Sequence, residues 1–397
     1  MKKKISLGAA ISLMALTAAV AVSMTAIFMM KSLNVSISNF TQRTALFKKL
    51  ADVDATVRAK YIGTINEDIL EDSTIAGYVN GLGDKYGVYL DANDYKSIAL
   101  SNEGRSIGIG VNVVKTDDGY MKVVSVIDGS PAQAAGVKVN DVITTIGNED
   151  VKATGYANAL NLLKGSEGTT VTFKVLRDGT SIPFTITRKK YEVSSVSSRL
   201  IGNLGYVKIM EFDKKTPTEF SSQVDKLIAD GAKGLVFDVR NNPGGLLESV
   251  EPIIDKIVPA GPVVSAKYKD GPKKVLYKSD AKEINLPMAV ITNQNTASAA
   301  ELFAAALKDY NKAKLVGTRT YGKGTMQEIC DLSDGTALDI SVAYFYPPKS
   351  DNFEGKGVAP DIKVELSEEK QRNFYSLDES DDDQLQAAIS YVEMQIK

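Results

Sequence analysis

The 397-residue sequence contains no histidine and no tryptophan, and it has a single cysteine. Without histidine there is no Ser-His-Asp triad, no Cys-His pair and no metal site with a histidine ligand. Cys330 cannot form a disulfide within the chain, and without histidine to activate it the thiol is a poor nucleophile. We therefore expect Cys330 to be a small buried apolar residue, and any enzymatic activity to use another base.

The sequence also lacks an excess of basic residues. Its 47 lysine and arginine residues are balanced by 49 aspartate and glutamate residues, which gives a net charge of -2. Proteins that bind nucleic acid neutralise phosphates with a basic surface, so we expect no nucleic-acid partner. The hydrophobic content of 44% is typical of a globular protein, and the length predicts two or three folded units.

The most apolar stretch lies at the N-terminus. Lys2, Lys3 and Lys4 precede residues 5–30, which carry no charge, and Lys31 follows. A helix of this length can cross a bilayer core of about 30 Å. We expect residues 1–31 to form a membrane anchor whose lysine-rich end stays in the cytoplasm, with the rest of the chain extracytoplasmic. A signal peptide cut near Ala19-Val20-Ala21, giving a secreted protein, is the alternative.

Hydrophobic patterns divide the rest of the chain into four regions and predict an α/β multidomain fold. Residues 39–100 have apolar residues at helical spacing and predict a small helical region. Residues 101–189 contain short β-rich runs and one helix near residues 155–163. In residues 190–367 strands and helices alternate, which predicts βα units and a largely parallel sheet. Residues 368–397 hold an acidic run, 378–383, expected to be a solvated linker and the start of a last helix.

Ser298 is the first candidate for chemistry. It lies between a buried-type strand at residues 288–292 and a helix that starts near the serine. The free N–H groups of a helix N-terminus favour an oxyanion that develops beside such a hydroxyl. Serine is also a common helix N-cap, and from this run alone capping is the better interpretation.

Lys323 is the best candidate for a base in a chain without histidine. Flanking Gly322 and Gly324 permit a tight backbone. To act near neutral pH, its pKa must fall by roughly 3 units from about 10.4, which burial in an apolar cleft can cause. The alternative is an ordinary surface lysine. The sequence that begins at Gly317 also resembles the motif of a phosphate-binding loop. Gly324, however, stands where that motif needs a serine or threonine hydroxyl to bind magnesium, so nucleotide binding is disfavoured.

Two glycine-containing loops offer backbone N–H groups. Gly244 and Gly245 follow a buried-type strand at residues 234–239 and offer backbone N–H groups for an oxyanion hole, although from this run alone an ordinary strand-to-helix turn is the better interpretation. A second loop enters a strand of the β-rich module, where a peptide could add as an extra strand and place its terminal carboxylate on the loop. The residues of this second loop are Ile107, Gly108, Ile109 and Gly110.

In this order, the motifs resemble those of the carboxyl-terminal processing peptidases, a serine-lysine family. The resemblance extends from about Tyr61 to Val364. Its motifs are Tyr86-Gly87-Val88-Tyr89-Leu90, Gly108-Ile109-Gly110, residues 240–245, residues 295–301, Gly322-Lys323-Gly324, Gln327 and residues 355–364. One departure is Ala300, where the family often has serine.

The resemblance implies a role for each matched residue. Ser298 would be the nucleophile, Lys323 the general base, and Gln327 the residue that orients the lysine. The oxyanion hole would use the N–H of Ala299 and that of Gly244 or Gly245. The β-rich module would be an inserted PDZ domain that receives the carboxyl end of the substrate on Ile107, Gly108, Ile109 and Gly110.

The function that follows is that of an anchored serine endopeptidase whose partners are polypeptides with a free C-terminus. We expect no metal and no cofactor, and the family resemblance suggests a homodimer through residues 39–98 or the last helix. One alternative is a PDZ-bearing scaffold or regulatory pseudopeptidase, against which Ser298, Lys323 and Gln327 argue. The other is a hydrolase of small esters or amides, in which a peptide-binding module would lack a purpose.

Overall fold

The computed structural model describes residues 17, 24, 41, 43–280 and 282–396, which fall into two compact units, 1–71 and 72–397. The expected anchor and the alternative cleavage site lie outside the described residues, apart from Thr17 and Met24, and both stay predictions. In the described part of the chain, no helix is both long and apolar enough to cross a membrane. Within the first unit, residues 43–60 are helical, and Arg58 forms ion pairs with Asp54 and Glu67.

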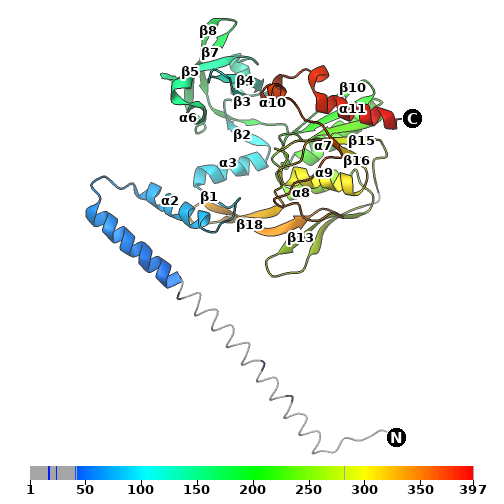
Figure 1. Ribbon diagram of the computed structural model, residues 1–397. Coiled ribbons are helices and arrows are strands. Elements are labelled where there is room, and N and C mark those ends of the chain that lie inside the picture. Colours follow the sequence, from blue (N-terminus) through cyan, green and yellow to red (C-terminus); the bar gives the residue numbers. More distant parts are fainter. Residues whose placement is uncertain (1–16, 18–23, 25–40, 42, 281, 397) are drawn as a thin grey trace, which may run out of the picture. The chain divides into compact units, whose positions relative to one another are not determined.

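A six-stranded sheet forms the centre of the second unit (Figure 1). Its order is β10-β11-β12-β15-β16-β19, in which β11 to β19 are parallel and β10 is antiparallel, so the predicted largely parallel sheet is confirmed. The strands are β10 (Val196–Ile201), β11 (Leu204–Ile209), β12 (Gly234–Asp238), β15 (Met288–Thr292), β16 (Ala313–Gly317) and β19 (Ile362–Lys363).

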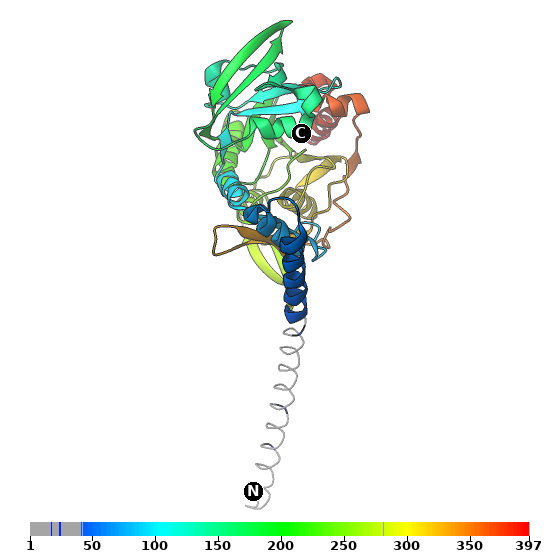
Figure 2. The same ribbon diagram turned by 90° about the vertical axis from the view of Figure 1, so that its left-hand side faces the viewer.

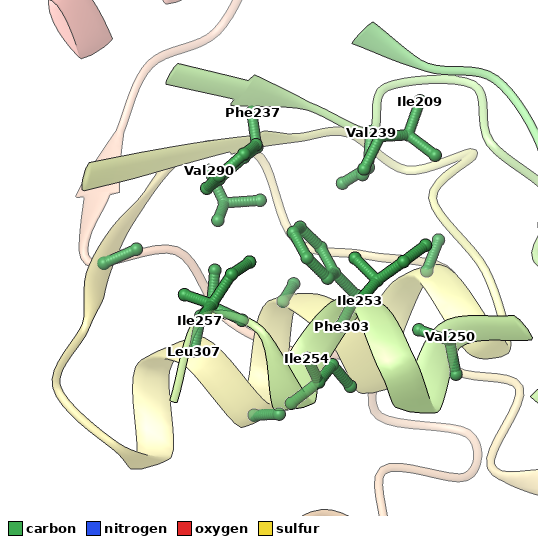
Figure 3. Close-up of a cluster of buried hydrophobic side chains, with 14 of the residues drawn as sticks. Ile209, Phe237, Val239, Val250, Ile253, Ile254, Ile257, Val290, Phe303 and Leu307 are labelled. Atoms are coloured by element: carbon green, nitrogen blue, oxygen red, sulfur yellow. The ribbon is translucent and has the colours of Figure 1, made fainter. Parts of the chain in front are cut away.

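Successive side chains of each buried strand point to opposite faces of the sheet, so both faces are apolar. Helices cover both of them. Phe237 and Val290 face Ile253 and Phe303 on one side, as Figure 3 shows, whereas Val236 belongs to the cluster on the other side. The first side is covered by α7 (Thr216–Ala229), α8 (Leu247–Asp255) and α9 (Ala299–Asp309), and the other by α11 (Asp383–Gln395). The candidate serine therefore stands where a buried strand meets a buried helix.

A second sheet, largely absent from the sequence prediction, carries Gln327. Its strands are β1 (Val88–Leu90), β13 (Gly261–Tyr268), β14 (Lys274–Ser279), β17 (Thr325–Asp331) and β18 (Ala337–Tyr346). The region expected to be helical, residues 39–100, thus includes a strand beside its helices α2 (Glu67–Asn80) and α3 (Ala92–Asn102). Cys330 lies in β17 and is half-buried, so the prediction of a buried cysteine is wrong; its strand faces the core on one side only.

The β-rich module has its own core and was predicted almost strand by strand. Its main sheet has the order β3-β4-β5-β7-β8, with β6 (Glu149–Asp150) beside β5. These strands are β3 (Val111–Lys115), β4 (Met121–Val126), β5 (Val142–Ile146), β7 (Thr170–Arg177) and β8 (Thr180–Thr187); the last two form the green hairpin in Figure 2. The helices are α4 (Pro131–Ala135), α5 (Val151–Thr154) and α6 (Tyr156–Leu163). A ladder of β2 (Arg105–Gly108) and β9 (Lys189–Glu192) closes the module.

The C-terminal region contains α10 (Glu368–Arg372) and two short 3-10 turns, Phe374–Ser376 and Glu379–Asp381, before α11. The expectation of a solvated acidic linker is wrong for Asp382, which is 7% exposed. Its carboxylate caps α11 through the N–H of Leu385 and accepts hydrogen bonds from Arg240 at 2.7 and 2.9 Å. Arg240 also donates to Asp238, so two buried carboxylates share one buried guanidinium.

We expect Arg240→Leu to lower the free energy of unfolding by about 3–5 kcal/mol, because it removes the cation that Asp382 pairs with and leaves Asp238 with Lys208 alone, at 3.5 Å. Urea denaturation measures the loss. The control is Arg199→Leu, which breaks the exposed pair with Glu379 and should cost about 1 kcal/mol or less. Equal losses for the two variants would show that the Arg240 cluster adds nothing beyond a surface pair.

Candidate active site

Ser298 stands between β15 and α9 in a backbone conformation that is rare for a residue with a side chain. Its φ is 54° and its ψ is -119°. Such a conformation costs on the order of 1–3 kcal/mol and persists only where surrounding contacts impose it. Ser298 occupies the N-cap position of α9, and with Glu301 at the third helical position it forms a capping box. The N-cap interpretation is therefore correct for the position of the residue, and the backbone strain is what distinguishes it from an ordinary cap.

The contact that imposes this conformation is a buried carboxylate, that of Glu301 in the first turn of α9. The Ser298 N–H donates to Glu301 Oε2 at 2.9 Å, and the Lys323 N–H donates to the same oxygen at 2.8 Å. Glu301 Oε1 accepts from the Gly322 N–H at 2.7 Å and from Thr320 Oγ1 at 2.5 Å. One side chain thus joins the backbones of the candidate nucleophile and the candidate base.

Glu301 has no exposed surface, and sequence reasoning assigned it no role. Burial raises the pKa of its carboxyl, while the hydrogen bonds from Thr320, Lys323 and Gly322 act in the opposite direction. The sequence signal that could have found it is the spacing Ser-x-x-Glu at a helix start, where the glutamate reaches back to the N-cap N–H.

Lys323 is half-buried, and its ammonium is poorly solvated. Burial lowers the pKa of Lys323, whereas Asp339, Asp84 and Glu354 act to raise it. Its Nζ donates to Gln327 Oε1 and lies 4.9 Å from the centre of the Tyr86 ring. The lysine therefore stands in the environment that a neutral amine at moderate pH requires.

Gln327 lies at a bulge in β17, where the register against β18 shifts. Its Nε2 donates to the backbone carbonyl of Tyr86 at 2.7 Å, while its Oε1 accepts from Lys323. Tyr86 belongs to a motif of the family resemblance, but the sequence predicts no role for it. Its contact with Gln327 is made by the main-chain carbonyl, which every residue type has.

The glycine loop after β12 lies directly against Ser298. A Cβ on Gly244 would meet the Ser298 Cβ at 2.8 Å and the Ala299 nitrogen at 3.1 Å. The Gly244 N–H donates to Asn242 Oδ1 at 2.8 Å, which occupies that donor. Phe212 forms a parallel bridge with the next residue, Gly245. In this bridge the Phe212 N–H donates to the Gly244 carbonyl and the Phe212 carbonyl accepts from the Leu246 N–H. The N–H of Gly245 itself therefore points away from Phe212. Of the two glycines considered, the geometry favours Gly245.

The predicted carboxylate loop is divided between two strand systems. Ile107 and Gly108 belong to β2 and pair with β9, and the chain turns at Gly110, where φ is 83°. The β-rich run expected over residues 107–114 is therefore two strands, and β3, which begins after the turn, is one edge strand of the module's main sheet. One groove includes the turn, β3 and α6; its lining residues include Gly108, Ile109, Gly110, Val111, Val113, Tyr156, Leu160 and Leu163.

The comparisons with known proteins agree with this geometry. Residues 203–364 match the model of peptidase family S41, and residues 107–187 match that of the PDZ domain. The chain is 33% identical over 323 residues to the carboxy-terminal processing protease CtpA of Bacillus subtilis (strain 168), a match that covers 81% of this chain and 69% of that protein. A probable CtpA-like serine protease of Staphylococcus aureus (strain MRSA252) is also 33% identical, over 81% of this chain and 65% of its own length.

Solved structures show the same architecture. The photosystem II D1 C-terminal processing protease matches with a TM-score of 0.50 and 26% identity, over 79% of this chain and 86% of that one. A putative S41 protease from Bacteroides fragilis NCTC 9343 matches with a TM-score of 0.56 and 18% identity, over 80% and 88%, which supports the fold alone. The predicted family is confirmed: the chain belongs to peptidase family S41 and is a serine peptidase, related to the carboxy-terminal processing proteases, that contains a PDZ domain.

Proposed function

We propose that this peptidase binds the C-terminus of a polypeptide through its PDZ domain and cleaves the chain with Ser298 as nucleophile and Lys323 as base. The observation that carries the proposal is the Glu301 carboxylate, which holds the backbones of both residues. A scaffold needs neither a serine in a costly conformation nor a half-buried lysine. These features disfavour the pseudopeptidase alternative.

In the proposed reaction, the neutral Lys323 amine takes the proton of the Ser298 hydroxyl as its oxygen attacks the scissile carbonyl. The N–H groups of Ala299, at the start of α9, and of Gly245 receive the developing oxyanion. The lysine ammonium then gives the proton to the leaving amine, and an acyl-enzyme forms. In the second half, Lys323 takes a proton from water as the water oxygen attacks the ester. The lysine ammonium then returns this proton to Ser298 Oγ as the C–O bond breaks and the acid product leaves.

Gln327 keeps the lysine oriented in both protonation states. An amide oxygen accepts a hydrogen bond equally from an ammonium and from a neutral amine, which still has two N–H donors. Because one of these donors faces Gln327 Oε1, the rotation of the amine is restricted and its lone pair is kept available. Gln327 therefore positions Lys323 and takes no part in the proton transfer itself.

The PDZ domain would bind a peptide along the free edge of β3. The terminal carboxylate would lie on the turn formed by Gly108, Ile109 and Gly110, and an apolar terminal side chain would contact Tyr156 and Leu160 in the groove. At Gly110 only glycine fits, because an added Cβ would lie 2.1 Å from the Ser130 Cβ. The turn thus offers backbone N–H groups without a covering side chain.

Ser298→Ala and Lys323→Arg should each lower kcat/KM for an unfolded protein substrate by at least roughly 10³-fold, because one removes the nucleophile and the other keeps its proton at every usable pH. The parent's kcat/KM should rise with pH through the lowered pKa of Lys323, since the neutral amine is the active form. The control is Lys314→Arg, an exposed lysine of β16. Cleavage by the Lys323→Arg variant at the parental rate would refute the proposal.

Glu301→Gln should lower the free energy of unfolding by about 1–3 kcal/mol and kcat/KM by more than about tenfold. At the Oε2 position an amide nitrogen would face the N–H groups of Ser298 and Lys323. At the Oε1 position it would face the Gly322 N–H and the Thr320 hydroxyl, so in either orientation at least one N–H group loses its acceptor. Urea denaturation and steady-state kinetics measure the two effects. Glu328→Gln, on the exposed side of β17, is the matched control. Parental kinetics for Glu301→Gln would mean that the carboxylate does not hold the site together.

A peptide with an apolar C-terminal residue should bind the full chain carrying Ser298→Ala about ten- to a hundredfold more tightly as the free acid than as the amide. The difference corresponds to the charge-assisted hydrogen bonds that the amide loses, roughly 1.5–3 kcal/mol. Calorimetric titration measures both affinities, and Leu160→Glu should weaken both by closing the groove. Equal affinities of acid and amide would remove the PDZ turn as a carboxylate site.

A further inference from the structure

One motif remains without a function: Tyr86-Gly87-Val88-Tyr89-Leu90, which precedes the PDZ domain in the sequence. We propose that Tyr86 is a positioning residue for the catalytic lysine: its carbonyl fixes the Gln327 amide, and its ring keeps water from Lys323 Nζ. This inference rests on the proposed function of Lys323 and Gln327, and it assigns to the segment before the PDZ domain a part of the catalytic site.

The carbonyl of Tyr86 decides which end of the Gln327 amide faces the lysine. The Gln327 Nε2 donates to this carbonyl at 2.7 Å. If the amide were reversed, its oxygen would face the Tyr86 carbonyl oxygen, so two acceptors would be opposed. Its NH₂ group would face the lysine, where it would oppose the ammonium or occupy the lone pair of the neutral amine. The Tyr86 carbonyl therefore ensures that Lys323 meets an acceptor.

The ring of Tyr86 fills the space beside the amine. Lys323 Nζ lies 4.9 Å from the ring centre. The face of the ring attracts a cation, but water attracts it more strongly, and the ring occupies space that water would otherwise fill. The Tyr86 hydroxyl has two acceptors for its one proton, Glu354 Oε1 at 3.2 Å and the Gly322 carbonyl at 3.4 Å, and so helps to hold the ring. It is thereby fixed to the turn that carries the lysine.

The segment is docked through Asp84 and β1. The Asp84 carboxylate accepts from the Ser341 N–H at 2.8 Å, from the Ser341 hydroxyl at 2.9 Å and from the Tyr86 N–H at 3.0 Å. Strand β1 then pairs with β18, with Val88 opposite Asp339. These contacts fix the position of the Tyr86 carbonyl independently of its side chain.

Several charged and titratable groups surround the Lys323 amine and affect its pKa. Asp339, whose Oδ1 is buried without a partner, and the other acidic neighbours favour the ammonium. Removing the ring would admit water, which favours the ammonium further. The groups acting on the amine are Asp84 and Tyr86 from the segment before β1, Asp339 from β18, Glu354 from the loop after β18 and Tyr321 beside the lysine turn, while Lys85 lies over the Tyr321 ring.

The test is the pH dependence of kcat/KM for Tyr86→Ala, Tyr86→Leu and Tyr86→Phe. In Tyr86→Ala the pH at which kcat/KM reaches half of its maximum should rise by about one pH unit. Below that midpoint kcat/KM should be about tenfold lower than in the parent, and at high pH it should equal the parental value. Tyr86→Leu, which keeps part of the apolar cover, should show a smaller upward shift. Tyr86→Phe keeps the ring and the carbonyl and should retain the parental midpoint.

Tyr95→Ala controls for the loss of a contact between the N-terminal segment and the second sheet. Tyr95 also links α3 to β17, through Asp331 at 2.6 Å, but it does not contact the lysine. It should leave the midpoint unchanged even if stability falls. Should Tyr86→Ala melt below the assay temperature, the shift in Tyr86→Leu decides the question.

Two outcomes separate this inference from the proposal beneath it. If Tyr86→Ala and Tyr86→Leu both keep the parental midpoint while Lys323→Ala is inactive, the lysine is catalytic and the role of Tyr86 is wrong. If Lys323→Ala is itself active, the proposed function is wrong, whatever the Tyr86 variants do. If kcat/KM of the Tyr86 variants is lower at every pH and the midpoint does not shift, the ring has only a structural role and the inference is wrong.

Discussion

The candidate site depends on one buried acceptor, the Glu301 carboxylate. It has no exposed surface and receives four hydrogen bonds, from Ser298, Thr320, Gly322 and Lys323. A buried carboxylate is costly unless its lone pairs are satisfied. Two separate loops provide the donors, and both must come to the same point. The cost of burying this carboxylate without its donors therefore favours the fold in which the backbones of the candidate nucleophile and the candidate base are neighbours.

The absence of histidine places a second constraint on the site, because a lysine acts as a base only when it is neutral. Asp339, Asp84 and Glu354 all favour the ammonium, so burial must outweigh three carboxylates, and the net shift of the Lys323 pKa is downward. The walls around the amine are therefore as important as its hydrogen-bond partner. An aromatic ring beside Nζ serves this purpose better than a polar side chain, since it excludes water without adding a charge.

The sequence predicted the elements whose signals are local. The strand at Met288–Thr292 and the helix after Ser298 appear as expected, because an apolar run, a polar turn and a helix start follow one another. The antiparallel sheet of β1, β13, β14 and β18 was missed. Strand β1 has only three residues, and its partner β18 is far away in the sequence, so no local pattern indicates their pairing. Asp382 was placed in solvent for the same reason: its partner Arg240 is far away in sequence.

The path of the chain explains how recognition and chemistry share the fold. Strands β2 and β9 pair at the two ends of the PDZ domain, so the whole module leaves and returns at one place. An insertion with neighbouring ends does not disturb the sheet around it. Tyr86 before the module and Gln327 after it can therefore meet beside β18, and the described contacts of Lys323 include no PDZ side chain. The candidate site is therefore built by the core alone, and in the proposed function the module adds the recognition of a polypeptide end.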